Sequence, residues 1–409
     1  MKKIYIIVFC CILVVVFAIG MGTGIFIQKH NSQTLTVSKA SVPEFQLVEQ
    51  AWNIVSKNYV DQKATQPQTL AYGTIDGMVN SLGDTEGSVF VTTEEAKLDS
   101  EVLQGQLQGI GIQVAETNGN VVILAPFDGS PAQKAGLQPG DIILDVNGQP
   151  VTGEEEAAAS IIGPVGTSVT LTIQSPAGTT SNVTITRAAI QVNSVTWEMV
   201  PGTSIADVQL VDFSQGTSAE LDTALSAIKA QGGTGIILDL RNTAAGFFNE
   251  AIGVASRFLN SGDVFEEKDA SGNITKNAVL TNVSKTDLPL VVLVNQGTGA
   301  CAEIVAGALQ YQGRAKLIGN ITSGTGTALN DFSLSDASEI ELGTQEWLTP
   351  SGKSIWHVGL TPDVTVSLAS GVVPLTPDTE KNLTMEQIEA SGDQQLLTAL
   401  ILTAHNLLQ

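Results

Sequence analysis

The stretch Asn295-Gln-Gly-Thr-Gly-Ala-Cys-Ala-Glu-Ile-Val-Ala-Gly307 lies between two segments of different periodicity. Before it, the apolar, β-branched run 288–294 predicts a buried strand, and after it Ala302 to Tyr311 has the spacing of a helix. A sharp strand-to-helix turn is therefore predicted at 298–300. Such a turn holds a reactive side chain at a helix N-terminus, where unpaired backbone N–H groups can stabilise an oxyanion. In this chain the turn carries no serine.

The strand-then-helix order continues on both sides of this turn. Strand patterns cover 203–211, 235–241 and 315–319, and helical patterns cover 217–231 and 250–259. Repeated β-then-α units predict an α/β core.

A different pattern, short β-rich runs with glycine turns, fills the region from Gln106 to Arg187. Within it, Ser130-Pro-Ala-Gln-Lys-Ala-Gly-Leu-Gln-Pro-Gly-Asp-Ile-Ile143 resembles a PDZ domain of the circularly permuted, protease-associated kind. PDZ domains add a peptide as a strand to an open sheet edge, and a turn of backbone N–H groups holds its carboxylate. The resemblance assigns peptide binding to Gly109, Ile110, Gly111 and Ile112. A Gly-x-Gly could equally be a β-bulge or a hairpin end.

The opening stretch, together with Gly324-Thr-Gly-Thr-Ala-Leu329, is similar to the active site of the C-terminal processing (tail-specific) peptidases. That family joins a PDZ domain to a serine–lysine protease core. Its nucleophile region runs approximately S-A-S-A-S-E-I, and a later G-K-G-x-x-Q element supplies the lysine general base and a supporting glutamine. Alignment places Ala300 at the serine, Thr325 at the lysine and Leu329 at the glutamine. The resemblance therefore implies a serine-type endopeptidase fold without its catalytic side chains.

The loop after the strand 235–241 departs from the family as well. Asp239-Leu-Arg-Asn242 matches a family motif that usually continues N-P-G-G and supplies a glycine N–H to the oxyanion hole. Here the continuation is Thr243, Ala244, Ala245 and Gly246, a degenerate oxyanion loop, because alanine resists backbone angles that glycine reaches. The resemblance extends from Phe45 to Ser367.

Other side chains offer weak substitutes for the missing chemistry. Cys301 follows the vacant serine position, and a cysteine at a helix N-terminus can have a depressed pKa, with His357 as a candidate base. A small buried cysteine in place of the family's alanine is the favoured interpretation. Thr298 and Ser323 have no identifiable base, and Lys353 stands where the family lysine is structural.

Composition limits the partners. The net charge of −22 argues against nucleic acid or an anionic membrane surface as a partner. Two of the three cysteines, Cys10 and Cys11, lie in an N-terminal apolar segment, so Cys301 has no disulfide partner in the main body. The spacing of His, Cys and acidic residues matches no metal motif, and no cofactor is predicted.

The N-terminal apolar segment, Ile4 to Ile27, is about long enough to cross a bilayer as a helix. Lys2 and Lys3 precede it, so the N-terminus is predicted to stay in the cytoplasm and the main body outside, giving a single-pass cell-membrane protein. The alternative is a cleaved secretory signal and a secreted protein.

The predicted fold is a multidomain α/β protein with a β-rich PDZ domain and a ClpP/crotonase-like tail-specific protease core. The predicted units are a transmembrane signal-anchor (1–30), a linker (31–43), an N-terminal helical region (44–105), the PDZ domain (106–190), the protease-like core (191–370) and a C-terminal helical tail (371–409).

The predicted function is that of a membrane-anchored pseudopeptidase. It would bind peptides or unstructured protein C-termini through the PDZ domain and the degenerate cleft, and an active relative is a candidate partner. The alternatives are an active peptidase with Cys301 as nucleophile and a structural envelope protein.

Overall fold

The computed structural model describes residues 43–84, 87–93, 95–96, 106–117, 119–127, 129–151, 153–191, 193–244 and 246–406. The predicted transmembrane segment lies outside these residues. Within them, no helix is both long and apolar enough to cross a membrane.

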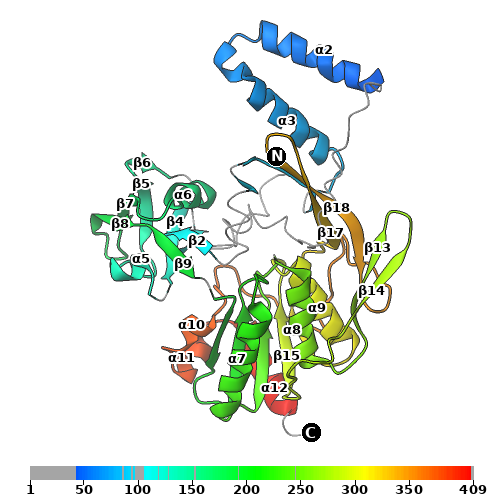
Figure 1. The fold of residues 1–409 in the computed structure, drawn as a ribbon. Coiled ribbons are helices and arrows are strands. Elements are labelled where there is room, and N and C mark those ends of the chain that lie inside the picture. The colour runs from blue at the N-terminus through cyan, green and yellow to red at the C-terminus, as the bar shows by residue number, and fades with distance from the viewer. Residues whose placement is uncertain are drawn as a thin grey trace.

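A six-stranded sheet in the order β10-β11-β12-β15-β16-β19 forms the centre of the core (Figure 1). β10 is antiparallel to β11, and the remaining neighbours are parallel. The strands are β10 (Val195–Met199), β11 (Ile205–Leu210), β12 (Gly235–Asp239), β15 (Leu290–Val294), β16 (Lys316–Gly319) and β19 (Val364–Thr365). Every residue of β12 and β15 is buried, which is why both strands are apolar apart from Asp239 at the end of β12. The predicted alternation of strands and helices is confirmed.

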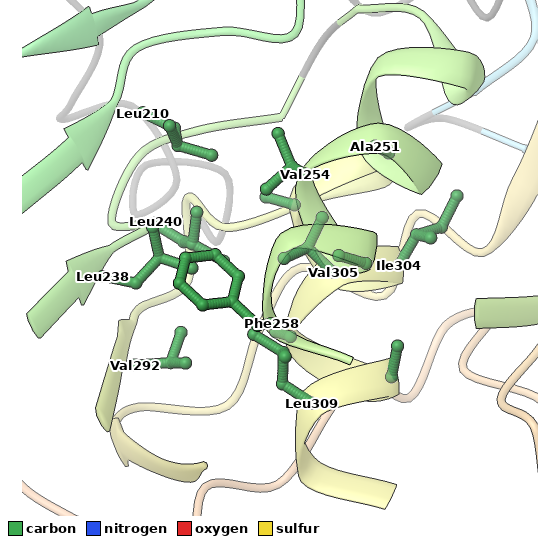
Figure 2. Close-up of a cluster of buried hydrophobic side chains, with 14 of the residues drawn as sticks. Leu210, Leu238, Leu240, Ala251, Val254, Phe258, Val292, Ile304, Val305 and Leu309 are labelled. Carbon is green, nitrogen blue, oxygen red and sulfur yellow. The ribbon is translucent and has the colours of Figure 1, made fainter. Parts of the chain in front are cut away.

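Three helices pack on one face of this sheet. They are α7 (Thr217–Ala230), α8 (Phe248–Phe258) and α9 (Ala300–Tyr311). Figure 2 shows Val254 and Phe258 of α8 and Val305 and Leu309 of α9 packed towards Leu238 of β12, within one buried cluster. This packing fixes the N-terminus of α9 beside the ends of β12 and β15.

The C-terminal segment covers the opposite face. It contains α10 (Pro377–Glu380), α11 (Met385–Ala390) and α12 (Gln394–Asn406). Leu396 and Leu400 of α12 are buried in one cluster with Ile237 of β12 and Val291 of β15. Residues 371–406, part of the predicted helical tail, thus form a layer of the core, because a parallel sheet needs both of its apolar faces covered.

A second sheet stands beside the core and joins it to the N-terminal helices. Its order is β1-β18-β13-β14, and β17 also pairs with β18. The strands are β1 (Val89–Val91), β13 (Asp263–Asp269), β14 (Ile274–Ala278), β17 (Thr327–Ser333) and β18 (Glu339–Leu348). The predicted N-terminal helices are confirmed as α2 (Pro43–Asn58) and α3 (Pro67–Asn80), with the short helix η1 (Gln62–Thr65) between them.

The PDZ region is a separate β-rich unit with its own apolar cluster. Its sheet has the order β3-β4-β5-β7-β8, with β6 on β5, so β3 lies at an edge. The elements are β3 (Ile112–Thr117), β4 (Asn120–Pro126), α5 (Pro131–Lys134), β5 (Ile142–Val146), β6 (Gln149–Pro150), α6 (Glu154–Ile161), β7 (Ser168–Gln174) and β8 (Thr180–Thr186). A two-stranded ribbon of β2 (Gln106–Gly109) and β9 (Ala188–Gln191) flanks this sheet in sequence.

Candidate active-site cleft and peptide-binding groove

The turn that begins α9 retains a constrained backbone, although its first helical residue is alanine. Ala300 has a φ of 41°, in the left-handed region that non-glycine residues rarely adopt. Thr298 anchors the turn, because its Oγ1 donates a hydrogen bond of 2.7 Å to the carbonyl of Leu240, just beyond β12. The neighbouring strand thus holds a strained backbone at the position that the family resemblance assigns to serine.

The position assigned to the lysine lies beside this turn. A Cβ atom on Gly299 would be 2.9 Å from Thr325 Oγ1 and 2.6 Å from Ser323 Oγ. These two hydroxyl groups are 2.9 Å apart and share a hydrogen bond. The structure therefore brings the start of α9 and position 325 together, but the latter presents a hydroxyl group and no amine.

The loop that carries Thr325 needs both of its glycines. Gly324 and Gly326 have φ values of 76° and 53°. A Cβ atom on Gly326 would be 2.3 Å from the Cα atom of Trp356, closer than atoms can approach. The Gly-x-Gly pattern is thus kept by backbone packing, independently of the residue between the glycines.

Glu303 of α9 organises this loop, a role that the sequence interpretation missed. Its Oε1 accepts hydrogen bonds from Thr322 Oγ1 and from the N–H of Gly324, 2.8 Å away, and its Oε2 accepts one from the N–H of Thr325 at 3.1 Å. Burial raises the pKa of Glu303 to about 7, against the lowering effect of these hydrogen bonds. The signal available in the sequence was an acidic residue inside the otherwise apolar run from Ala300 to Leu309.

The predicted unpaired N–H groups at this helix N-terminus are not observed, which corrects that expectation. Gly299 N–H donates to the carbonyl of Thr243 at 2.9 Å, and Cys301 N–H donates to the carbonyl of Ala244 at 3.0 Å. Ala302 and Glu303 donate to the carbonyl of Gly299. The Ala300 N–H interacts with the Glu303 carboxyl group. The carbonyls of Thr243 and Ala244 therefore accept hydrogen bonds from the N–H groups on both sides of Ala300.

The rest of this loop is close to the core. Gly246 has a φ of 134°, and a Cβ atom there would be 2.4 Å from the carbonyl oxygen of Phe213. Thr243 is buried, and its Oγ1 donates to the carbonyl of Leu210. Ala245 lies outside the described residues. A glycine is retained where backbone packing demands one.

Cys301 and His357 occupy different environments. Cys301 is 1% exposed, within the core cluster, and its thiol donates to the carbonyl of Gly246 at 3.3 Å. Burial raises the pKa of this thiol, so the thiolate form is strongly disfavoured. His357 is exposed in a turn, where its ring stacks on Trp356 with the ring centroids 4.6 Å apart.

The two remaining positions singled out in the sequence, Leu329 and Lys353, make packing or backbone contacts only in the described part of the chain. Leu329 lies on β17 with a buried side chain, opposite Gly343 of β18. Lys353 lies in an exposed turn, where its backbone exchanges hydrogen bonds with Thr349. Among the described residues, no group of His, Cys, Asp or Glu side chains could hold a metal ion.

The predicted PDZ turn lies at the start of the edge strand β3. Ile110 and Ile112 are buried, and the carbonyl of Ile110 accepts a hydrogen bond from Ala132 N–H at 2.9 Å. Gly111 has a φ of 74°, and a Cβ atom there would be 2.5 Å from Ser130 Cβ. Gly109 is different, because a Cβ atom there would meet nothing within 4 Å. The turn is thus held against the Ser-Pro-Ala segment by glycine at 111.

The comparisons with known proteins agree with this architecture. Residues 204–366 match the model of peptidase family S41, and residues 122–175 match a PDZ domain model. The chain is 35% identical over 345 residues to carboxy-terminal processing protease CtpA of Bacillus subtilis, covering 83% of this chain and 72% of that relative. It is 32% identical over 369 residues to a probable CtpA-like serine protease of Staphylococcus epidermidis, covering 89% and 73%.

Solved structures give the same result. The photosystem II D1 C-terminal processing protease aligns with a TM-score of 0.51 and 26% identity, covering 83% of this chain and 97% of that one. A putative S41 protease from Bacteroides fragilis aligns with a TM-score of 0.58 at 17% identity, which shows a shared fold. The chain belongs to peptidase family S41 and combines its core with a PDZ domain.

Proposed function

We propose that this chain is a pseudopeptidase that binds peptides or unstructured protein C-termini without cleaving them. One observation carries the proposal: alanine and threonine occupy the two positions that the family alignment assigns to serine and lysine, and Thr325 lies beside Gly299 at the start of α9. Ala300 has no oxygen to deprotonate, and the hydroxyl of Thr325 cannot serve as a general base. The buried thiol of Cys301, with its raised pKa, gives no support to a cysteine nucleophile.

Binding is supported by the PDZ unit. Among the described residues, β3 has a partner strand on one side only, and its other edge can accept a peptide strand through main-chain hydrogen bonds. The turn 109–112 lies at the start of that strand, where backbone N–H groups can hold a terminal carboxylate. The proposed ligand is therefore an extended peptide with a free C-terminus.

The test uses the purified exported chain and short unstructured peptides with an apolar last residue. Binding is measured by calorimetry, and cleavage by mass spectrometry after prolonged incubation. Binding to the free acid, weaker binding to the C-terminal amide and intact peptide would support the proposal. Cleavage that disappears in Cys301→Ala would refute it in favour of the unorthodox peptidase, and absence of binding would favour a structural role.

The glycines of the PDZ turn provide a matched pair of variants. Gly111→Ala is expected to weaken peptide binding by about tenfold or more, since a side chain there is strained and collides with Ser130. Gly109→Ala is expected to leave the affinity within about twofold, because its Cβ meets open space. Calorimetric titration of both variants, with circular dichroism to confirm folding, measures this difference. Equal affinities would show that the peptide binds elsewhere.

We also propose that Ile4–Ile27 anchors the chain in the cell membrane with the main body outside. This proposal is supported by the length of the apolar run and by the preceding lysines. The full-length chain is expected to remain in the membrane pellet after alkaline carbonate washing and to dissolve only with detergent. Recovery of a shorter, washable chain would instead indicate signal cleavage.

A further inference from the structure

A buried acidic cluster lies between the central sheet and the C-terminal helices. It contains Asp207 in the middle of β11, Asp239 at the end of β12, Glu380 at the end of α10 and Asp393 just before α12. Arg241 is its one buried cation among the described residues. Four carboxyl groups and one guanidinium cannot all be ionised without a large desolvation cost.

The guanidinium of Arg241 forms ion pairs with two of the four carboxyl groups, those of Asp239 and Asp393. Arg241 Nη2 is 2.6 Å from Asp239 Oδ2, and Nη1 is 2.8 Å from Asp393 Oδ2. Its Nε donates to both carboxyl oxygens of Asp239, and its other side-chain hydrogen bonds go to the carbonyl of Leu375 and the amide oxygen of Gln395. No donor nitrogen of Arg241 is left for Asp207 or Glu380.

The side chains of Asp207 and Glu380 lie next to each other in this cluster. Both residues are 0% exposed. Within the described part of the chain, no donor contacts any of their four carboxyl oxygens. The two carboxyl groups lie within hydrogen-bond range of each other, a contact that becomes a hydrogen bond only when one of them carries a proton.

We propose that Asp207 and Glu380 share a proton and act as a pH-sensitive clasp that holds α10 against the sheet. With the proton present, one carboxyl group donates to the other, and a single buried charge remains. When that proton is lost, two adjacent carboxylates repel in a dry environment, and α10 must move to admit water.

The surrounding charges are consistent with opening at higher pH. Glu198 of β10 lies opposite Asp207 in the sheet and adds a further carboxyl group. On α10, Asp378 pairs with Lys381 at 2.9 Å. Burial, the nearby carboxyl groups of Asp239 and Glu380, and the shared contact raise the pKa of Asp207 well above its ordinary value.

The pKa of Glu380 is raised as well, because burial moves it from 4.5 to about 7. A carboxyl group with a raised folded-state pKa stabilises the folded form below its unfolded pKa, and this stabilisation is lost as pH rises through the folded value. The clasp is therefore closed in acid and weakens from about pH 7 upward. Because α10 contacts β10 and β11, opening would uncover the face of the sheet at these two strands.

Hydrogen exchange of the exported chain at matched pH tests the clasp. Glu380→Gln removes the titration but keeps the shape, and Glu386→Gln on exposed α11 is the control. At pH 8.5, amides of 377–406 are expected to exchange about tenfold faster in the wild type than in Glu380→Gln, and at pH 5.5 within about twofold. Equal rates at both pH values, or the same effect in the control, would overturn the proposal.

Asp207→Asn provides a second variant, for which the same pH-selective protection is expected. The wild-type chain alone also gives an answer if neither variant folds. After correction for the intrinsic pH dependence of exchange, the rate for 377–406 should still accelerate between pH 5.5 and 8.5. An unchanged corrected rate would mean that no proton is shared in this layer.

Discussion

Glu303→Ala is expected to lower the free energy of unfolding by about 3–5 kcal/mol, because removing one buried partner leaves several donors unsatisfied. The hydroxyl of Thr322 and the N–H groups of Gly324 and Thr325 all lose their acceptor. The side chain is 1% exposed, so water cannot easily replace it. Urea unfolding followed by fluorescence measures this loss.

Two variants make the cause specific. Glu303→Gln keeps one oxygen for Thr322 and Gly324 but turns an NH₂ group towards Thr325 N–H, so a smaller loss of about 1–2 kcal/mol is expected. Glu386→Ala on α11 removes an exposed carboxylate and is expected to stay within about 0.5 kcal/mol of the wild type. If Glu303→Ala were as stable as this control, the carboxyl group would not organise the loop.

The pH dependence has a defined sign. The pKa of Glu303 is about 7 in the folded chain and 4.5 ordinarily, so the folded chain holds a proton that the unfolded chain releases. Stability associated with this group is present below about pH 4.5 and is lost as pH rises through 7. Glu303→Gln is therefore expected to show a shallower fall in unfolding free energy between pH 5 and pH 8 than the wild type.

The sequence predicted elements whose local pattern decides their structure. β12 and β15 were identifiable because their residues are all buried and, apart from Asp239 at the end of β12, lack polar side chains, and α9 because its sequence from Ala300 to Leu309 is apolar except for Glu303. Gly111 and Gly326 were predicted from motif resemblance, and the structure gives each a steric reason through Ser130 and Trp356.

Other features depend on contacts between residues far apart in sequence. The hydrogen bond from Cys301 N–H to the carbonyl of Ala244 joins the first turn of α9 to a loop more than fifty residues earlier, and no local pattern encodes it. The same is true of the contact between Asp207 and Glu380. These residues lie far apart in the sequence, one on β11 and one on the short helix α10. From the sequence alone, a carboxylate within a strand is expected to be exposed to solvent. Its burial is recognised only once the segment that covers the strand is known.

Restoring the catalytic side chains alone is expected to yield no measurable peptidase activity. The triple variant Ala300→Ser, Thr325→Lys and Leu329→Gln supplies a nucleophile, a base and a supporting amide at the aligned positions. The N–H of Cys301 nevertheless remains paired with the carbonyl of Ala244, and that of Gly299 with Thr243. When the new serine attacks a substrate carbonyl, the oxyanion of the tetrahedral intermediate would meet donors that already have acceptors, and losing such a donor costs about 10²–10³-fold in rate.

Grafting the family loop onto this triple variant separates the two deficiencies. Thr243→Asn, Ala244→Pro and Ala245→Gly recreate N-P-G-G, and the six-residue variant is expected to cleave apolar-ended peptides at least about 10²-fold faster than the triple variant. The loop graft alone, without the serine, is the control and is expected to cleave no peptide. Cleavage by the triple variant at the rate of the grafted one would show that these backbone hydrogen bonds open readily. If neither variant cleaves peptides, the remaining defect lies at the lysine position. The space beside Gly299 is lined by the hydroxyl groups of Ser323 and Thr325, and a lysine there would have to lose the water around its ammonium group.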